Sequence, residues 1–90
     1  MGIALIKIKI MPVSPDTDLE EIKTSAKQIV EENNGLRAVF EEEPIAFGLK
    51  AVIVSFDIDE ANPLEQIEEG LRNMENVNSA EVIDMRRAFG

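Results

Sequence analysis

The sequence predicts a small α+β domain whose elements follow one another in the order β-α-β-β-α-β. At 90 residues and 44% apolar composition, the chain is long enough for one hydrophobic core and too short for two. Four stretches read as strands and two carry apolar residues at helical spacing, with a short link between the second and third strands. This order is the split arrangement of the ferredoxin-like sandwich, a four-stranded antiparallel sheet with two helices on one face. We expect a single domain over residues 1–90.

The first strand is predicted over Ile3 to Met11. Its side chains alternate with a period of two, which is typical of a half-buried strand. We expect one set to face the helices, namely Ile6, Ile8 and Ile10, and the other to face away, namely Leu5, Lys7 and Lys9.

A helix follows the break at residues 12–15. Either Thr17 with Glu20 or Asp18 with Glu21 supplies the capping arrangement at its start, and the pattern favours neither. The residues at helical spacing are Leu19, Ile22, Ala26, Ile29 and Val30. We expect residues 33–35 to end the helix, with Gly35 as the left-handed C-cap.

The middle of the sequence predicts an antiparallel hairpin. Its first strand runs from Leu36 to Phe40, and the acidic run 41–44 is interpreted as a solvated turn into a long apolar strand that reaches Ile58. That strand has two apolar faces, as a central strand does. Its alternating sets are Val52, Val54 and Phe56 on one face and Ala51, Ile53 and Ser55 on the other.

Asn62 is the predicted cap of the second helix, with Pro63 at its first position and Glu65 three residues after the cap. We expect Gly70 where this helix approaches the sheet. The buried stripe is Leu64, Ile67, Leu71 and Met74. Residues 76–78 are the predicted turn into a last strand over 79–87.

The composition excludes several function classes. Lys and Arg total 9 against 18 Asp and Glu, and the resulting net charge of −9 argues against nucleic-acid binding. The absence of Cys and His removes thiol nucleophiles, histidine bases and ordinary zinc sites. A hard-cation site at Asp57, Asp59 and Glu60 is disfavoured, because the loop lacks the spacing of a calcium hand. Lysine interrupts the N-terminal apolar run early, so we expect no membrane span and a cytoplasmic protein.

Residues 44–50 are the segment that the fold alone explains least. Pro44, Phe47, Gly48 and Lys50 place a stiff corner, an aromatic ring, a glycine and a cation within seven residues. One interpretation is a recognition edge, with Gly48 and Lys50 on one face of the strand. The other is a hairpin whose Phe47 caps the core, because aromatic side chains dominate cores as well as interfaces.

Two arginines, Arg86 and Arg87, stand side by side near the C-terminus of this acidic chain. They either neutralise nearby glutamates, or one of them projects into an anionic site on a partner.

Two motifs in the sequence resemble the guanine-nucleotide-exchange domain of the elongation factor 1-beta/delta family. They are Glu43-Pro44-Ile45-Ala46-Phe47-Gly48-Leu49-Lys50 and Val82-Ile83-Asp84-Met85-Arg86-Arg87. The resemblance covers essentially the whole chain, and the length is similar to the archaeal form rather than the longer eukaryotic one. It implies a factor that promotes exchange of GDP for GTP on elongation factor 1-alpha, the GTPase that delivers aminoacyl-tRNA.

The resemblance also implies an interaction site and no catalytic residue, metal or cofactor, so the chain is not expected to be an enzyme. Phe47 would pack into the GTPase, and Arg87, with Arg86 as the fallback, would take the role of a family lysine that disturbs the magnesium and phosphate region. The expected contact residues are Ile45, Ala46, Phe47, Gly48, Lys50, Met85, Arg86 and Arg87. We expect a monomer that contacts neither nucleic acid nor membrane.

Two other classes remain open from the sequence. A small-molecule-sensing domain of the same fold would bind its ligand at a dimer interface, and an assembly subunit would bind its partner without altering nucleotide affinity. Neither would accelerate GDP release, so that measurement separates the three.

Overall fold

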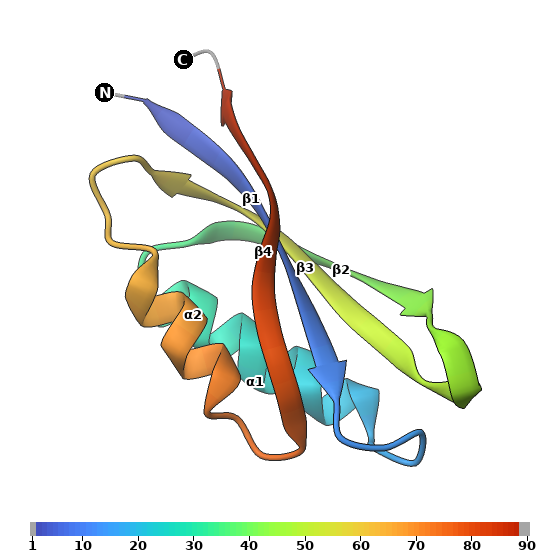
Figure 1. The fold of residues 1–90 in the computed structure, drawn as a ribbon. Coiled ribbons are helices and arrows are strands. Elements are labelled where there is room, and N and C mark those ends of the chain that lie inside the picture. Colours follow the sequence, from blue (N-terminus) through green and yellow to red (C-terminus); the bar gives the residue numbers. More distant parts are fainter. Residues whose placement is uncertain (1, 89–90) are drawn as a thin grey trace.

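The computed structural model describes residues 2–88, which form one antiparallel sheet with two α-helices on one of its faces (Figure 1). The strand order in this part of the chain is β2-β3-β1-β4. The elements are β1 (Ile3–Pro12), α1 (Leu19–Glu32), β2 (Leu36–Pro44), the single 3-10 turn η1 (Ala46–Gly48), β3 (Lys50–Asp59), α2 (Glu65–Arg72) and β4 (Val77–Ala88). The predicted ferredoxin-like α+β fold is confirmed.

The core lies between the central strands and the helices. Ile8 is fully buried and is paired with Val54 across the β1–β3 ladder, which places the two side chains on the same face. Ile6, Ile10, Val52 and Phe56 are also buried, whereas Lys7 is exposed, so the predicted facing of both strands is confirmed. The helices close the core with Ile22, Ala26, Val30, Ile67 and Leu71.

Helix α1 begins at the second of the two caps that the sequence offered. The side chain of Asp18 accepts a hydrogen bond from the backbone N–H of Glu20 at 3.0 Å. The helix ends within the predicted residues 33–35, but the left-handed residue there is Asn34, with φ 71°, and not Gly35. Gly35 is required for space instead: a Cβ there would lie 2.3 Å from Cγ1 of Val30.

Helix α2 begins later than predicted, at Glu65, and Asn62 does not cap it. The segment before the helix is a turn organised by Asp59, whose carboxylate accepts from the N–H of Ala61 at 2.8 Å and whose carbonyl accepts from the N–H of Asn62 at 2.9 Å. The predicted role of Gly70 is also wrong. Its missing Cβ would lie 3.0 Å from Cγ2 of Ile29 on α1, so the glycine lets the two helices approach, not a helix and the sheet.

The acidic run is not a turn but the second half of strand β2. Glu41, Glu42 and Glu43 are paired with Ile53, Val52 and Ala51 of β3. β2 is an edge strand whose backbone pairs with β3. Glutamates are tolerated there because their side chains reach solvent. The last strand likewise begins at Val77, two residues earlier than predicted.

Candidate partner-binding site

The tip of the β2–β3 hairpin presents Phe47 to solvent. Phe47 is 94% exposed, and its backbone is left-handed, with φ 63° and ψ 30°. Gly48 follows at φ 79°, and the N–H of Leu49 donates to the carbonyl of Ala46 at 3.3 Å. Two successive left-handed residues are what a type I′ turn requires, and Asn-Gly is the usual pair. The interpretation of Phe47 as a core cap is therefore wrong, as is the placement of Gly48 in a strand.

Backbone hydrogen bonds flank the turn that carries Phe47. The hairpin ladder continues to the pair Pro44 and Lys50, and beyond it the N–H of Ile45 donates to the carbonyl of Leu49 at 2.7 Å. A left-handed phenylalanine is strained, and its exposed ring gains almost nothing from burial. An aromatic side chain held outward in this way is suited to filling an apolar pocket on another protein.

The predicted C-terminal residues lie at the end of β4, and the register gives their directions. Arg87 is paired with Ala4, which points to the helix-covered face, whereas Arg86 is paired with Leu5 on the open face. The Nε of Arg86 lies 3.0 Å from a carboxylate oxygen of Asp84. The remaining predicted residue, Met85, is 60% exposed.

The structure does not bring the two predicted motifs together. Asp57 and Arg86 are both paired with Leu5, at the far end of the sheet from Lys50 (Figure 1). Lys50 and Asp57 are seven positions apart along β3, a distance of about 23 Å at a rise of ~3.3 Å per residue. The contact residues therefore form two groups, which we call the hairpin tip (residues 45–50) and the β4 end (residues 85–87).

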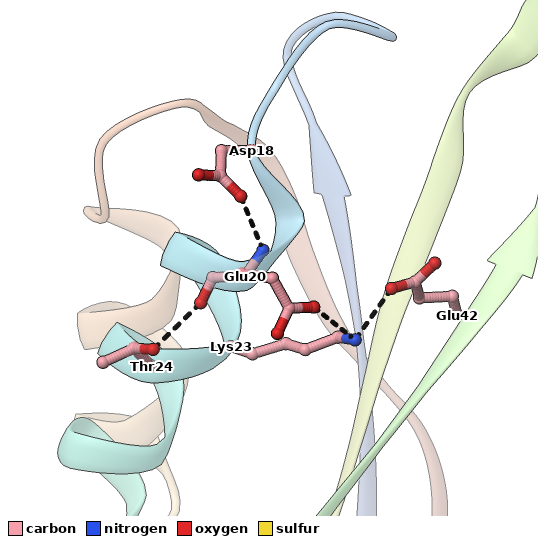
Figure 2. Close-up of polar contacts among 5 residues, drawn as sticks. All are labelled: Asp18, Glu20, Lys23, Thr24 and Glu42. Atoms are coloured by element: carbon pink, nitrogen blue, oxygen red, sulfur yellow. Dashed lines mark hydrogen bonds and ion pairs between the residues drawn. The ribbon is translucent and has the colours of Figure 1, made fainter.

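A small ionic network joins α1 to the hairpin, and sequence reasoning missed it. Figure 2 shows the Nζ of Lys23 between Glu20 of the same helix, at 3.0 Å, and Glu42 of β2, at 2.7 Å. The hydrogen bond from Lys23 holds the pKa of Glu42 below its ordinary value, and the bonds to Glu42 and Glu20 raise the pKa of Lys23. The available signal was strand alternation, which places Glu42 on the helix-covered face with Val52.

Sequence reasoning also missed the contact of Glu60 with the β4 end. Glu60, which follows β3, accepts a hydrogen bond from the Nε of Arg87 at 2.5 Å. In residues 2–88, no group of three or more acidic side chains is arranged to hold a metal ion, so Asp57, Asp59 and Glu60 do not form one. Neither helix in this part of the chain is long and apolar enough to cross a membrane.

The sheet carries an exposed aromatic turn at one end and exposed arginines at the other, features suited to a protein-binding domain. The chain belongs to the EF-1 guanine nucleotide exchange domain family, whose model matches residues 5–88. Elongation factor 1-beta of Methanosarcina barkeri is 43% identical over 88 residues, which cover 97% of this chain and 99% of the relative. Elongation factor 1-beta of Methanococcus maripaludis strain C7 is 38% identical over 86 residues, or 94% and 97% of the two chains. The resemblance read from the sequence is thus confirmed.

Proposed function

We propose that this protein promotes the replacement of GDP by GTP on elongation factor 1-alpha, without chemical catalysis of its own. The observation that carries the proposal is the match to the exchange domain family across residues 5–88. The relatives named elongation factor 1-beta match over nearly their whole length and support the same role. The protein acts as a cytoplasmic monomer, needs no cofactor and contacts neither nucleic acid nor membrane.

The hairpin tip supplies the docking contact in this proposal. The ring of Phe47 enters an apolar pocket of the GTPase, and Ile45, Ala46, Gly48 and Lys50 surround it. The turn is already in its bound shape, so little conformational entropy is lost on docking.

The β4 end supplies the exchange function. Arg87 reaches the magnesium and phosphate region of the GTPase, while Met85 and Arg86 contact its surroundings. An arginine competes there with the interactions that retain GDP, because guanidinium groups bind anionic sites well. Each tenfold loosening of GDP requires about 1.4 kcal/mol of differential binding, and the coupling is reciprocal, so arriving nucleotide expels the factor.

Release of fluorescent GDP from elongation factor 1-alpha, with and without the protein, tests the proposal. We expect the release rate to rise with the concentration of the protein and to saturate. A protein that binds the GTPase with no change in the release rate would be an assembly subunit. If the protein neither binds the GTPase nor accelerates GDP release, small-molecule sensing is the alternative that remains.

A further inference from the structure

We propose that Glu60 is a positioning residue for nucleotide exchange, which holds the side chain of Arg87 so that its terminal amino groups face the partner. This inference rests on the proposed function and adds a residue outside both predicted motifs. Its basis is the contact between the Glu60 carboxylate and the Nε of Arg87, together with the way Glu60 is itself held.

Glu60 contacts Gly2, just before β1, through both its backbone and its side chain. Its backbone N–H donates to the carbonyl of Gly2 at 3.0 Å, which ties the end of β3 to the start of β1. Its carboxylate lies directly over Gly2, where a Cβ would come within 2.1 Å of Oε1. The side chain of Glu60 is 33% exposed and that of Arg87 is 76% exposed, so the glutamate forms the inner half of the pair.

The contact with Glu60 uses the Nε of Arg87 and leaves the two terminal nitrogens of the guanidinium available. An arginine has five N–H donors, of which one is on Nε and four are on the terminal nitrogens. The Nε of Arg87 donates to Oε2 of Glu60 at 2.5 Å, and within residues 2–88 this is the ion pair that Arg87 forms. The terminal nitrogens keep the planar fork that recognises carboxylates and phosphates with two parallel hydrogen bonds.

Other arginines in the described chain are held differently. Arg37 contacts Asp57 through Nη2 as well as Nε, and Arg72 uses Nη2 for Glu68 and Nε for the carbonyl of Ala80. One terminal nitrogen of each, Nη2, is therefore already engaged with the protein. Arg86 also uses Nε, but its partner Asp84 lies on the same strand and the pair faces the open side of the sheet.

The Glu60 and Arg87 pair borders a surface hollow large enough to receive a segment of the partner. The hollow has a volume of about 520 Å³, and its apolar lining includes Ile58, Leu64 and Met85. A loop of the GTPase seated there would bring its anionic groups to the guanidinium. In this arrangement Glu60 limits the conformations of Arg87 before the partner arrives, and preorganisation of this kind reduces the entropy lost on binding.

The test measures stimulated GDP release from elongation factor 1-alpha as a function of factor concentration for wild type and Glu60→Gln. The amide keeps the size of the side chain and removes its charge. We expect the maximal rate to fall about threefold to tenfold, or ~0.7 to 1.4 kcal/mol at 1.4 kcal/mol per tenfold, with a smaller change in the half-saturating concentration. A thermal unfolding curve verifies that the variant is folded.

Two comparisons give the result its meaning. Glu68→Gln removes a carboxylate that is likewise paired with an arginine, on α2, and should keep the wild-type rate. In an Arg87→Ala background, Glu60→Gln should have no further effect, because the group it positions is gone.

Three results would overturn the inference. If the wild type accelerates GDP release and Glu60→Gln accelerates it equally, the role of Glu60 is wrong and the proposed function stands. If it slows release equally with and without Arg87, Glu60 acts by another route. If the wild type itself does not accelerate release, the proposed function fails and the role of Glu60 fails with it.

Discussion

Phe47 carries a cost that the isolated domain does not recover. A left-handed backbone costs a non-glycine residue about 1 to 2 kcal/mol, and a ring that is 94% exposed returns little of this through packing. Asparagine would suit the same turn better. In the proposed function, a partner that covers the ring offsets this cost, since strained residues cluster where a protein binds its ligands.

Replacing Phe47 separates binding from folding. Phe47→Ala should change the free energy of unfolding by about 0.5 kcal/mol or less and weaken the complex with nucleotide-free elongation factor 1-alpha by about 2 kcal/mol or more. Phe47→Asn should weaken the complex as much while stabilising the domain by ~1 kcal/mol, because asparagine tolerates the turn. Denaturant unfolding and a binding titration measure both quantities. Unchanged affinity would remove Phe47 from the site.

Ile8 is the opposite case, a residue whose role lies in the core alone. Its side chain is fully buried between the sheet and the helices. Ile8→Ala should lower the free energy of unfolding by about 2 to 5 kcal/mol, the usual cost of emptying a core position. The neighbouring Lys7→Ala, on the open face, should change it by ~0.5 kcal/mol or less. Equal effects in urea unfolding would contradict the facing of β1.

At the scale of elements, the edge strand β2 depends on helix α1. Lys23 reaches across from the helix to Glu42, and the hairpin tip begins at the end of this strand (Figure 2). The hydrogen bond from Lys23 lowers the pKa of Glu42, so the charged carboxylate is favoured in the folded state. The network thus links helix α1 to the hairpin strand β2 through Lys23 and Glu42.

This pKa shift predicts a pH dependence of stability. A lowered pKa contributes stability that is present above the unfolded pKa of glutamate, about 4.3, and is lost as the pH falls through the lower folded value. The wild type should therefore be more stable than Glu42→Gln at about pH 6, and the difference should shrink as the pH falls toward ~3. Urea unfolding of both proteins at several pH values measures this. A difference that grows on acidification would contradict the assigned pKa direction.

The elements differ in how well the sequence predicts them. Strand β1 and the stripe of α1 are read correctly, because burial imposes a period on Ile6, Ile8 and Ile10 and on Ile22, Ala26 and Val30. The acidic half of β2 is misread, since consecutive glutamates are typical of a solvated turn and the pairing that makes them an edge strand comes from β3. The start of α2 is misread because Asp59 organises the preceding turn and the Asn62-Pro63 pattern also suits a helix cap.

For the whole molecule, the sequence predicts the fold better than it predicts the arrangement of the proposed contact residues. The exposure of Phe47 and the directions of Arg86 and Arg87 depend on turn geometry and on the register of β4. That register shifts between Lys7 and Ile8, so simple alternation along β4 does not give it. The contact with Glu60 spans 27 positions in the sequence and has no local signal.

The fold places the two proposed contacts at opposite ends of a stiff sheet. A central strand pairs on both edges and is buried, so β1 and β3 maintain the separation of the hairpin tip and the β4 end. The whole molecule is elongated, with principal extents of 42 × 21 × 17 Å. It is therefore suited to contact two separate parts of a larger partner, with one end docking and the other acting on the nucleotide.

In the proposed function, Arg87 is the residue that acts on the nucleotide site. Arg87→Lys should keep part of the stimulated GDP release if a point charge suffices, and lose it if a planar, two-bonded contact is needed. Arg86→Ala removes one positive charge from the other side of the sheet and should lower the maximal release rate less than Arg87→Ala does. If Arg86→Ala fails while Arg87→Ala is fully active, the role belongs to Arg86.

The most direct measurement of this division is stimulated GDP release as a function of factor concentration, compared for Phe47→Ala and Arg87→Ala. We predict that Phe47→Ala raises the half-saturating concentration by about thirtyfold, equal to ~2 kcal/mol, and keeps the maximal rate. Arg87→Ala should lower the maximal rate and change the half-saturating concentration less. Variants that alter the two quantities in the same proportion would contradict the assignment of docking and exchange to opposite ends of the sheet.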